Sequence, residues 1–450
     1  MDRTIRFLED HGIITDEAAD KFALRSPIDD VRKLIGEIRV LLYATREENA
    51  HVYGESPIDA YNFVPSRSLR GDTCGYWDCA KSKLGLLARY SALYADHVFL
   101  PLHIPRPEAL EDSVLPRDNI SLNLKEILLL RHLIEVGIVR VMVPEFHFCR
   151  ECAKAAKAQV QMIEREAQAL HFAHREKFSG SYRALDGLQG IAGVASLDGP
   201  TEYLEHGGIA CVFSHKPPWI PGYHGTEPVR LTGKQLEESG LVREVFRSIG
   251  WDVIFQQFYG ARFDAKYLTD LPGEAEFMNR ISNADELVQR VASLAAQLTH
   301  TIPLFSEVSI PAILRVRKEG NEPLILYRAA LAEIVRDHLA KGEQVTPGRA
   351  REIFFEILEP SLVGLKAEAK AMRAKSAKKA VAKVGVPAAL VCLGVWGGFL
   401  PAALSALFKA VGGVSMAANM AETLASMEKN PYELRSHNLY FLLRLTEEAG

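Results

Sequence analysis

The most constraining feature of this sequence is an uncharged stretch near its C-terminus, residues 384–408, which reads VGVPAALVCLGVWGGFLPAALSALF. A membrane-spanning helix needs about 20 apolar residues, so the length of the stretch permits a span. The preceding segment, 366–383, is rich in lysine, which suits a cytoplasmic flank or an anionic lipid surface. Any fold of this chain must either place the stretch in lipid or cover it with protein.

Proline positions argue against a single straight span. Pro401 lies inside the stretch, and a proline in the middle of a helix kinks or breaks it. If Pro387 and Pro401 each begin a helix, the sequence predicts a Gly/Ala-rich apolar hairpin within 384–428. Its first arm, 387–396, would be about 15 Å long, half the hydrocarbon thickness of a bilayer. The hairpin is therefore covered by the protein itself, by a partner or by lipid.

Composition sets the broad class of the protein. The 450 residues are 48% hydrophobic and 24% charged, which is ordinary for a globular chain of two or three domains. The formal net charge of −4 does not support nucleic-acid binding. Six unevenly placed cysteines do not suggest a disulfide scaffold, and residues 1–22 lack the apolar core of a secretory signal. We expect a cytoplasmic protein, with association at the inner face of the membrane through the hairpin as an open alternative.

The pattern along the chain predicts a mainly α fold with an α/β (α+β) core. We expect N-terminal helices in 1–55, an α/β core in 56–270 and a helical C-terminal region in 271–450. Within the core, apolar runs at 97–102 and 138–143 flank a helical segment, which predicts parallel neighbouring strands with a right-handed crossover.

Four further segments of the core give definite expectations. A long helix is predicted from near Cys149 to about Lys177, because apolar residues recur on one face. Strands are predicted at 209–215 and 251–260, which are rich in apolar and β-branched residues. Turn formers and glycine predict irregular loops over 50–80 and 178–208.

Four cysteines form two close pairs. Cys74 and Cys79 have four residues between them, Cys149 and Cys152 have two, and His147 lies just before the second pair. Tetrahedral zinc is held by four N or S ligands, and two such loops can supply them, so the pairs suggest a structural zinc site with His147 as a substitute ligand. Two alternatives stay open: unrelated core or surface cysteines, and a redox dithiol, because Cys149 and Cys152 lie between a strand and a helix as in thioredoxin-like folds.

Three residues are weak catalytic candidates. Asp96 stands at the head of a predicted strand, where it either serves as a nuclease-like metal ligand or caps the strand. Cys211 and His215 lie within and at the end of another predicted strand, 209–215, and could form a nucleophilic pair. The sequence contains no P-loop, GxGxxG or GxSxG motif, so no complete catalytic signature supports an enzyme.

Two C-terminal segments carry a family resemblance. They are IPLFSEVSIPAILRVRKEGNEPLILYRAALAEIV, starting at Ile302, and NPYELRSHNLYFLLRL, starting at Asn430. Roughly the last 150 residues resemble uncharacterised bacterial proteins, some from phage-defence or other conflict loci. The resemblance implies an interaction or effector role on a partner protein, a second copy or a membrane. The alternative is an enzyme that uses the α/β core as a metal-dependent nuclease or a cysteine hydrolase.

Overall fold

The computed structural model describes most of the chain outside the C-terminal hairpin. The described residues are 2–52, 61–71, 76–110, 114–143, 149–185, 192–204, 207–213, 215, 217–220, 227–263, 265–281, 291, 294–296, 298–299, 308–318, 322–339, 345–367 and 440–449. The chain forms two compact units. Unit 1 contains Met1–Ser91 and Ala95–Gln289, and unit 2 contains Ala92–Tyr94 and Arg290–Gly450.

A parallel four-stranded sheet, sheet A, is the centre of unit 1. Its strand order is β3-β2-β1-β8, and all neighbouring strands are parallel. The strands are β1 (Asn62–Pro65), β2 (His97–Pro101), β3 (Val139–Met142) and β8 (Lys266–Leu268). The predicted parallel pairing of 97–102 with 138–143 is confirmed, with Val98 opposite Val139.

Helices α5 (Trp77–Tyr94) and α6 (Val114–Glu135) connect these strands. The chain adds β2 and β3 on one side of β1, and later adds β8 on the other side. The carboxyl ends of β1 and β8 therefore form a topological switch point, the place where open α/β sheets bind ligands. The strands are almost wholly buried, as expected of a parallel sheet covered on both faces.

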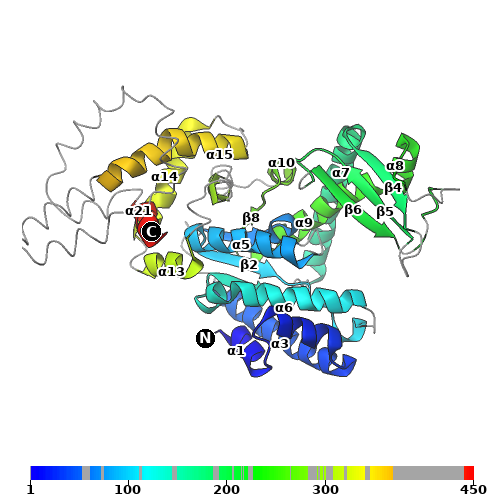
Figure 1. Ribbon diagram of the computed structural model, residues 1–450, viewed down its shortest axis with the longest axis horizontal. Coiled ribbons are helices and arrows are strands. Elements are labelled where there is room, and N and C mark those ends of the chain that lie inside the picture. The colour runs from blue at the N-terminus through cyan, green and yellow to red at the C-terminus, as the bar shows by residue number, and fades with distance from the viewer. Residues whose placement is uncertain are drawn as a thin grey trace, which may run out of the picture. The chain divides into compact units, whose positions relative to one another are not determined.

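Within unit 1 the N-terminal helices pack against α6 and β3, and Figure 1 shows α1 and α3 beside α6. They are α1 (Arg3–Asp10), α2 (Asp16–Asp20) and α3 (Ile28–Val52). In α3 the apolar side chains that follow 3–4 spacing, among them Val31, Ile35 and Ile38, are buried. The expected helical N-terminus is confirmed, and it shares a compact unit with the α/β core.

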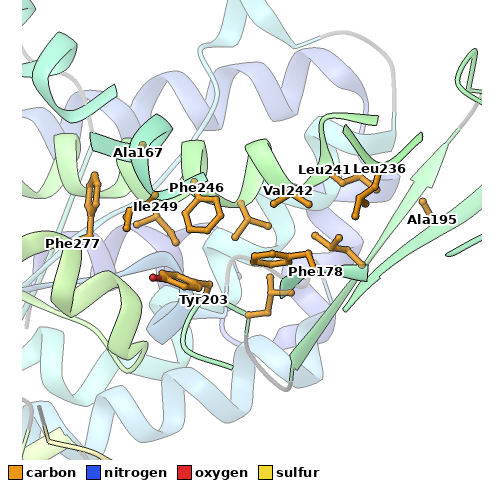
Figure 2. Packing of buried hydrophobic residues seen from close by; sticks show 14 of the residues in the cluster. Ala167, Phe178, Ala195, Tyr203, Leu236, Leu241, Val242, Phe246, Ile249 and Phe277 are labelled. Carbon is orange, nitrogen blue, oxygen red and sulfur yellow. The ribbon is translucent and has the colours of Figure 1, made fainter. Parts of the chain in front are cut away.

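An insertion between β3 and β8 carries a second, antiparallel sheet. Sheet B has the order β6-β5-β4-β7, with β4 (Ser179–Ala184), β5 (Gly193–Asp198), β6 (Gly208–Phe213) and β7 (Val229–Arg230). Helices α7 (Arg150–His174), α8 (Gly233–Ser239) and α9 (Leu241–Phe263) contribute many of the buried side chains of the core on which this sheet packs. Figure 2 shows Phe178 and Tyr203 meeting Phe246 of α9 in this core.

Local sequence explains the main elements of the insertion. Helix α7 begins after Cys149 and buries Ile163, Ala167 and Leu170, so the predicted long helix is confirmed. Helix α8 begins with a capping box, in which Thr232 and Gln235 satisfy each other's backbone N–H groups. The predicted strand within 209–215 is confirmed as β6.

Three local expectations are wrong. Residues 251–260 form part of α9 rather than a strand. Buried apolar side chains continue along one face of this helix from Val242 to Ile254. The loop expected over 178–208 contains β4 and β5, where glycine allows close packing: a Cβ at Gly193 would lie 2.3 Å from the Tyr182 hydroxyl. The loop expected over 50–80 contains β1 and the start of α5.

Unit 2 is helical in its described part. Its helices are α13 (Ile310–Lys318), α14 (Glu322–His338), α15 (Pro347–Ile353), which continues as a π-helical turn at Phe354–Leu358, and α21 (Tyr440–Ala449). Helix α21 packs against α13 and α14, where the rings of Tyr327 and Phe441 stack with centroids 5.8 Å apart. Arg328 is buried, and its Nε donates to the carbonyl oxygen of Tyr94 at 2.8 Å.

The mainly α fold with a mixed α/β core is thus confirmed. The predicted apolar hairpin 384–428 lies outside the described residues. Within the described part of the chain, no helix is both long and apolar enough to cross a membrane. The division into 1–55, 56–270 and 271–450 is not tested by the two-unit organisation and stays a prediction.

Candidate functional site

The switch point of sheet A is built directly after the ends of β1 and β8. The backbone N–H of Ser66, directly after β1, donates to the carbonyl oxygen of Leu268 at the end of β8 at 2.7 Å. The pairing of the two strands ends here. The Ser66 side chain caps the short helix α4 (Arg67–Arg70) by accepting from Leu69 N at 3.1 Å. Gly71 ends α4 with φ of 76°, a left-handed conformation that glycine adopts without strain.

Charged side chains from four separate elements meet at this edge. Lys83 of α5 pairs with Asp270 after β8, with Nζ 2.5 Å from Oδ2. Asp252 of α9 accepts the backbone N–H of Arg67 at 3.1 Å, and the Arg67 Nε lies 4.0 Å from it. Both carboxylates are largely buried, so the paired cations offset the cost of removing them from water.

A buried carboxyl, Glu274, completes the group on α10 (Pro272–Ile281). Its Oε2 accepts hydrogen bonds from Tyr267 at 2.9 Å and from Thr269 at 2.5 Å. Burial, aided by the negative charge of Asp252, raises the pKa of Glu274 to about 8. Glu274 is therefore mostly protonated at neutral pH. We call Arg67, Lys83, Asp252, Asp270 and Glu274 the switch-point cluster.

The switch-point cluster was missed by sequence reasoning. Lys83 and Asp270 are 187 positions apart, and neither lies in a recognisable motif. Only the strand order could have revealed the cluster, because β1 and β8 are neighbours in the sheet and the turns that follow them therefore lie side by side. One atom of the cluster, Oδ1 of Asp270, is buried without a hydrogen-bond partner among the described residues.

Asp96 lies at the opposite edge of sheet A. It precedes β2, and its Oδ2 accepts the backbone N–H of Tyr61 at 3.0 Å while its own N–H donates to Tyr61 O at 2.9 Å. This reciprocal pair aligns the starts of β1 and β2. Ligands of open α/β sheets bind at the carboxyl ends of the strands, so the position of Asp96 favours the strand-capping alternative.

Cys211 and His215 lie on or beside sheet B, away from the parallel strands. Cys211 is in β6, half-buried against the core that α7 and α9 cover. Burial, aided by the charge of Glu244, raises the pKa of the Cys211 thiol, which disfavours the nucleophilic thiolate. His215 is exposed beyond the end of β6, and within the described residues the two side chains share no hydrogen bond.

Three of the four paired cysteines are described. Cys79 is exposed in the first turn of α5, and Cys149 and Cys152 are exposed at the start of α7. Cys74 and the substitute ligand His147 lie outside the described residues. Among the residues that the structure does describe, no three His, Cys, Asp or Glu side chains come together as a metal site. The structural zinc site stays a prediction.

At the start of α7 the two cysteines interact with each other. Sγ of Cys149 occupies the N-cap position and accepts the backbone N–H of Cys152 at 3.4 Å. Hydrogen bonds from the backbone and the thiol of Cys152 lower the pKa of Cys149. The hydrogen bond between the two side chains raises the pKa of Cys152. The two thiols are therefore chemically unequal.

A cavity of about 270 Å³ opens between α7 and α9. Its lining includes the buried His171 and the exposed rings of Phe172 and Trp251. The carboxylate of Glu237, which also lines the cavity, lies 4.0 Å from His171 and 3.7 Å from Arg175. Arg175 therefore balances its negative charge. Burial lowers the pKa of His171, which keeps the imidazole neutral near pH 7.

Comparison with known proteins finds no relative of this chain. No family model, no curated protein and no solved structure matches the chain.

Proposed function

We propose that this protein is an interaction or effector protein of a bacterial system that acts against phage. In this proposal it works through the C-terminal region 271–450, whose apolar hairpin 384–428 meets a partner protein, a second copy of the chain or the inner face of the membrane. The α/β unit serves as the scaffold and regulatory part rather than as a catalyst.

The observation that carries this proposal is the state of the switch-point cluster. An enzyme on an open α/β sheet places catalytic groups at this edge, ready to meet a substrate. Here Lys83 and Asp270 neutralise each other, Asp252 holds the α4 backbone, and Glu274 is buried and mostly protonated. The charges at the edge thus hold elements of unit 1 together, which is what a scaffold requires.

The residues first suspected of catalysis support the same proposal. Asp96 joins the starts of two strands, and Cys211 has a pKa raised by burial. The C-terminal region instead contains the longest uncharged stretch, 384–408, next to a lysine-rich segment. Covering such an apolar stretch with protein or lipid is favourable, because it removes apolar surface from water.

Purified full-length protein provides the first test. Sedimentation velocity measures self-association, and flotation with vesicles of anionic phospholipid measures membrane binding. We expect the wild-type chain to self-associate or to float, and Leu400→Asp to lose that behaviour while it keeps the wild-type urea midpoint. A monomeric wild-type chain that stays at the bottom of the gradient would contradict both the self-association and the membrane form of the proposal.

An enzyme remains the second candidate because of one specific observation. Oδ1 of Asp270 is buried, lies at the switch point and has no hydrogen-bond partner among the described residues, as a group that awaits a ligand would. The nuclease-like and cysteine-hydrolase forms of this candidate depend on Asp96 and Cys211. Loss of cellular activity in Asp96→Ala or Cys211→Ala, at unchanged protein level, would favour the enzyme.

A further inference from the structure

Cys149 and Cys152, which we call the α7 dithiol, stand together at the first turn of a 25-residue helix. Cys149 is the N-cap residue, and the Cys152 N–H points to its sulfur at 3.4 Å. The Cys152 thiol is itself hydrogen-bonded to Cys149, so the two sulfurs are near neighbours. Both side chains are exposed to solvent. A reagent from solution can therefore reach either sulfur.

The surroundings favour a sulfur anion at the N-cap position. The first backbone N–H groups of a helix lack partners within the helix, and the helix dipole adds partial positive charge there. The acidic residue of this turn, Glu151, is paired with Lys154 at 2.9 Å, which reduces its repulsion of a thiolate. Cysteines in such positions are the reactive ones in thiol–disulfide exchange.

We propose that the α7 dithiol is a thiol–disulfide exchange site whose substrate is a small-molecule disulfide of the glutathione type. The Cys149 thiolate attacks one sulfur of the disulfide, whose S–S bond breaks as a mixed disulfide forms and one thiolate leaves with a proton from water. Cys152 then loses its proton to solvent and attacks Cys149 Sγ, which forms the Cys149–Cys152 disulfide and releases the second thiol. The dithiol loses two electrons, and the small disulfide becomes two thiols.

The geometry favours exchange over zinc binding by the same sulfurs. A structural zinc site needs four ligands and encloses the metal. Both sulfurs of the α7 dithiol are exposed to solvent, whereas a closed zinc site would cover them. Cys79 provides a matched comparison, because it is also an exposed cysteine in the first turn of a helix, yet its described neighbours in that turn include no second cysteine.

The test uses full-length protein in buffers with graded ratios of reduced to oxidised glutathione, quenched with acid and alkylated, with each cysteine peptide read by mass spectrometry. We expect a Cys149–Cys152 disulfide that forms and disappears reversibly as the ratio changes. Cys152→Ser should accumulate a glutathione adduct on Cys149, because the second step is blocked. In Cys149→Ser the adduct on Cys152 should form about tenfold more slowly. Cys79→Ser should behave as the wild-type chain.

Three results would overturn the proposal. The first is the absence of a Cys149–Cys152 disulfide in fully oxidised glutathione. The second is equal adduct formation on Cys149 of Cys152→Ser and on Cys79, which would mark ordinary exposed thiols. The third is one equivalent of zinc per chain together with protection of both sulfurs until a chelator is added, which would assign the α7 dithiol to the metal site.

Discussion

Arg70 and Glu126 form a buried two-point ion pair, with Nε to Oε1 and Nη2 to Oε2 both at 3.1 Å. Arg70 ends α4 directly after β1, and Glu126 lies in the middle of α6, so the pair ties the turn at the switch point to the crossover helix. The two residues are 2% and 4% exposed. A fork-shaped guanidinium and a carboxylate match well in this geometry.

Removing one member of this pair should be strongly destabilising. Glu126→Ala leaves the Arg70 charge buried without its carboxylate, and we expect the free energy of unfolding to fall by about 3–5 kcal/mol. Arg70→Met combined with Glu126→Leu removes both charges and should recover most of that loss. Urea unfolding followed by circular dichroism measures both variants. Arg247→Ala, which breaks the exposed pair with Glu244, serves as the control and should leave the urea midpoint unchanged.

If Glu126→Ala and Arg247→Ala had equal urea midpoints, the Arg70–Glu126 pair would not hold the fold together. A double variant no more stable than Glu126→Ala would contradict the ionic explanation and favour a shape requirement at α6.

Gly71 and Gly12 allow the cost of a left-handed backbone to be separated from the cost of a steric clash. Both have left-handed φ angles, 76° and 70°. A Cβ at Gly71 would lie 2.5 Å from the Ala80 Cα atom, whereas a Cβ at Gly12 would have no atom within 4 Å. Gly12→Ala should cost about 1–2 kcal/mol, the usual penalty of the left-handed conformation. Gly71→Ala should cost clearly more in the same urea experiment, because α4 must also move away from α5. Equal costs would show that the approach of Gly71 to Ala80 has no energetic consequence.

Glu274 makes stability depend on pH in a definite direction. Its pKa rises from 4.5 to about 8 in the folded chain, so between these values the folded state holds a proton that the unfolded state releases. The stabilisation is therefore complete below about pH 4.5 and is lost as pH rises through about 8. The slope from this group is at most about 1.4 kcal/mol per pH unit.

Glu274→Gln checks this sign, because the amide cannot titrate and resembles the protonated acid. We expect the free energy of unfolding of the wild-type chain, measured between pH 5 and pH 9, to fall relative to that of the variant. The variant should be the more stable protein above about pH 8. Parallel profiles for the two proteins would show that Glu274 titrates near its ordinary pKa.

Sequence pattern predicted those elements in which local periodicity and burial agree. The long α7 helix and the parallel strands at 97–102 and 138–143 follow directly from apolar spacing. Strand β1 was missed because it has only four residues, ends in Pro65 and is flanked by turn formers. The apolar run at 251–260 predicts a strand although it forms a helix, because short apolar segments fit either a buried strand or a buried helix.

The candidate site shows the same limit more strongly. The α7 dithiol was visible from its spacing, because both cysteines lie in one helical turn. The switch-point cluster joins Lys83, Asp252 and Asp270 across long sequence separations, and the pairing follows only from the order of strands in sheet A. Asp96 was visible as a candidate at the head of a predicted strand, but its hydrogen bonds with Tyr61 follow only from the pairing of β2 with β1, which was not predicted.

We propose that the protein acts through its C-terminal apolar region rather than through catalytic groups of the α/β unit. The most direct measurement is the efficiency of plating of a phage panel on bacteria that express the wild-type chain, Leu400→Asp, Asp96→Ala or Cys211→Ala at equal levels on immunoblots. We expect the wild-type chain, Asp96→Ala and Cys211→Ala to protect equally, and Leu400→Asp to lose protection. Full protection by Leu400→Asp together with loss in Asp96→Ala or Cys211→Ala would contradict the claim.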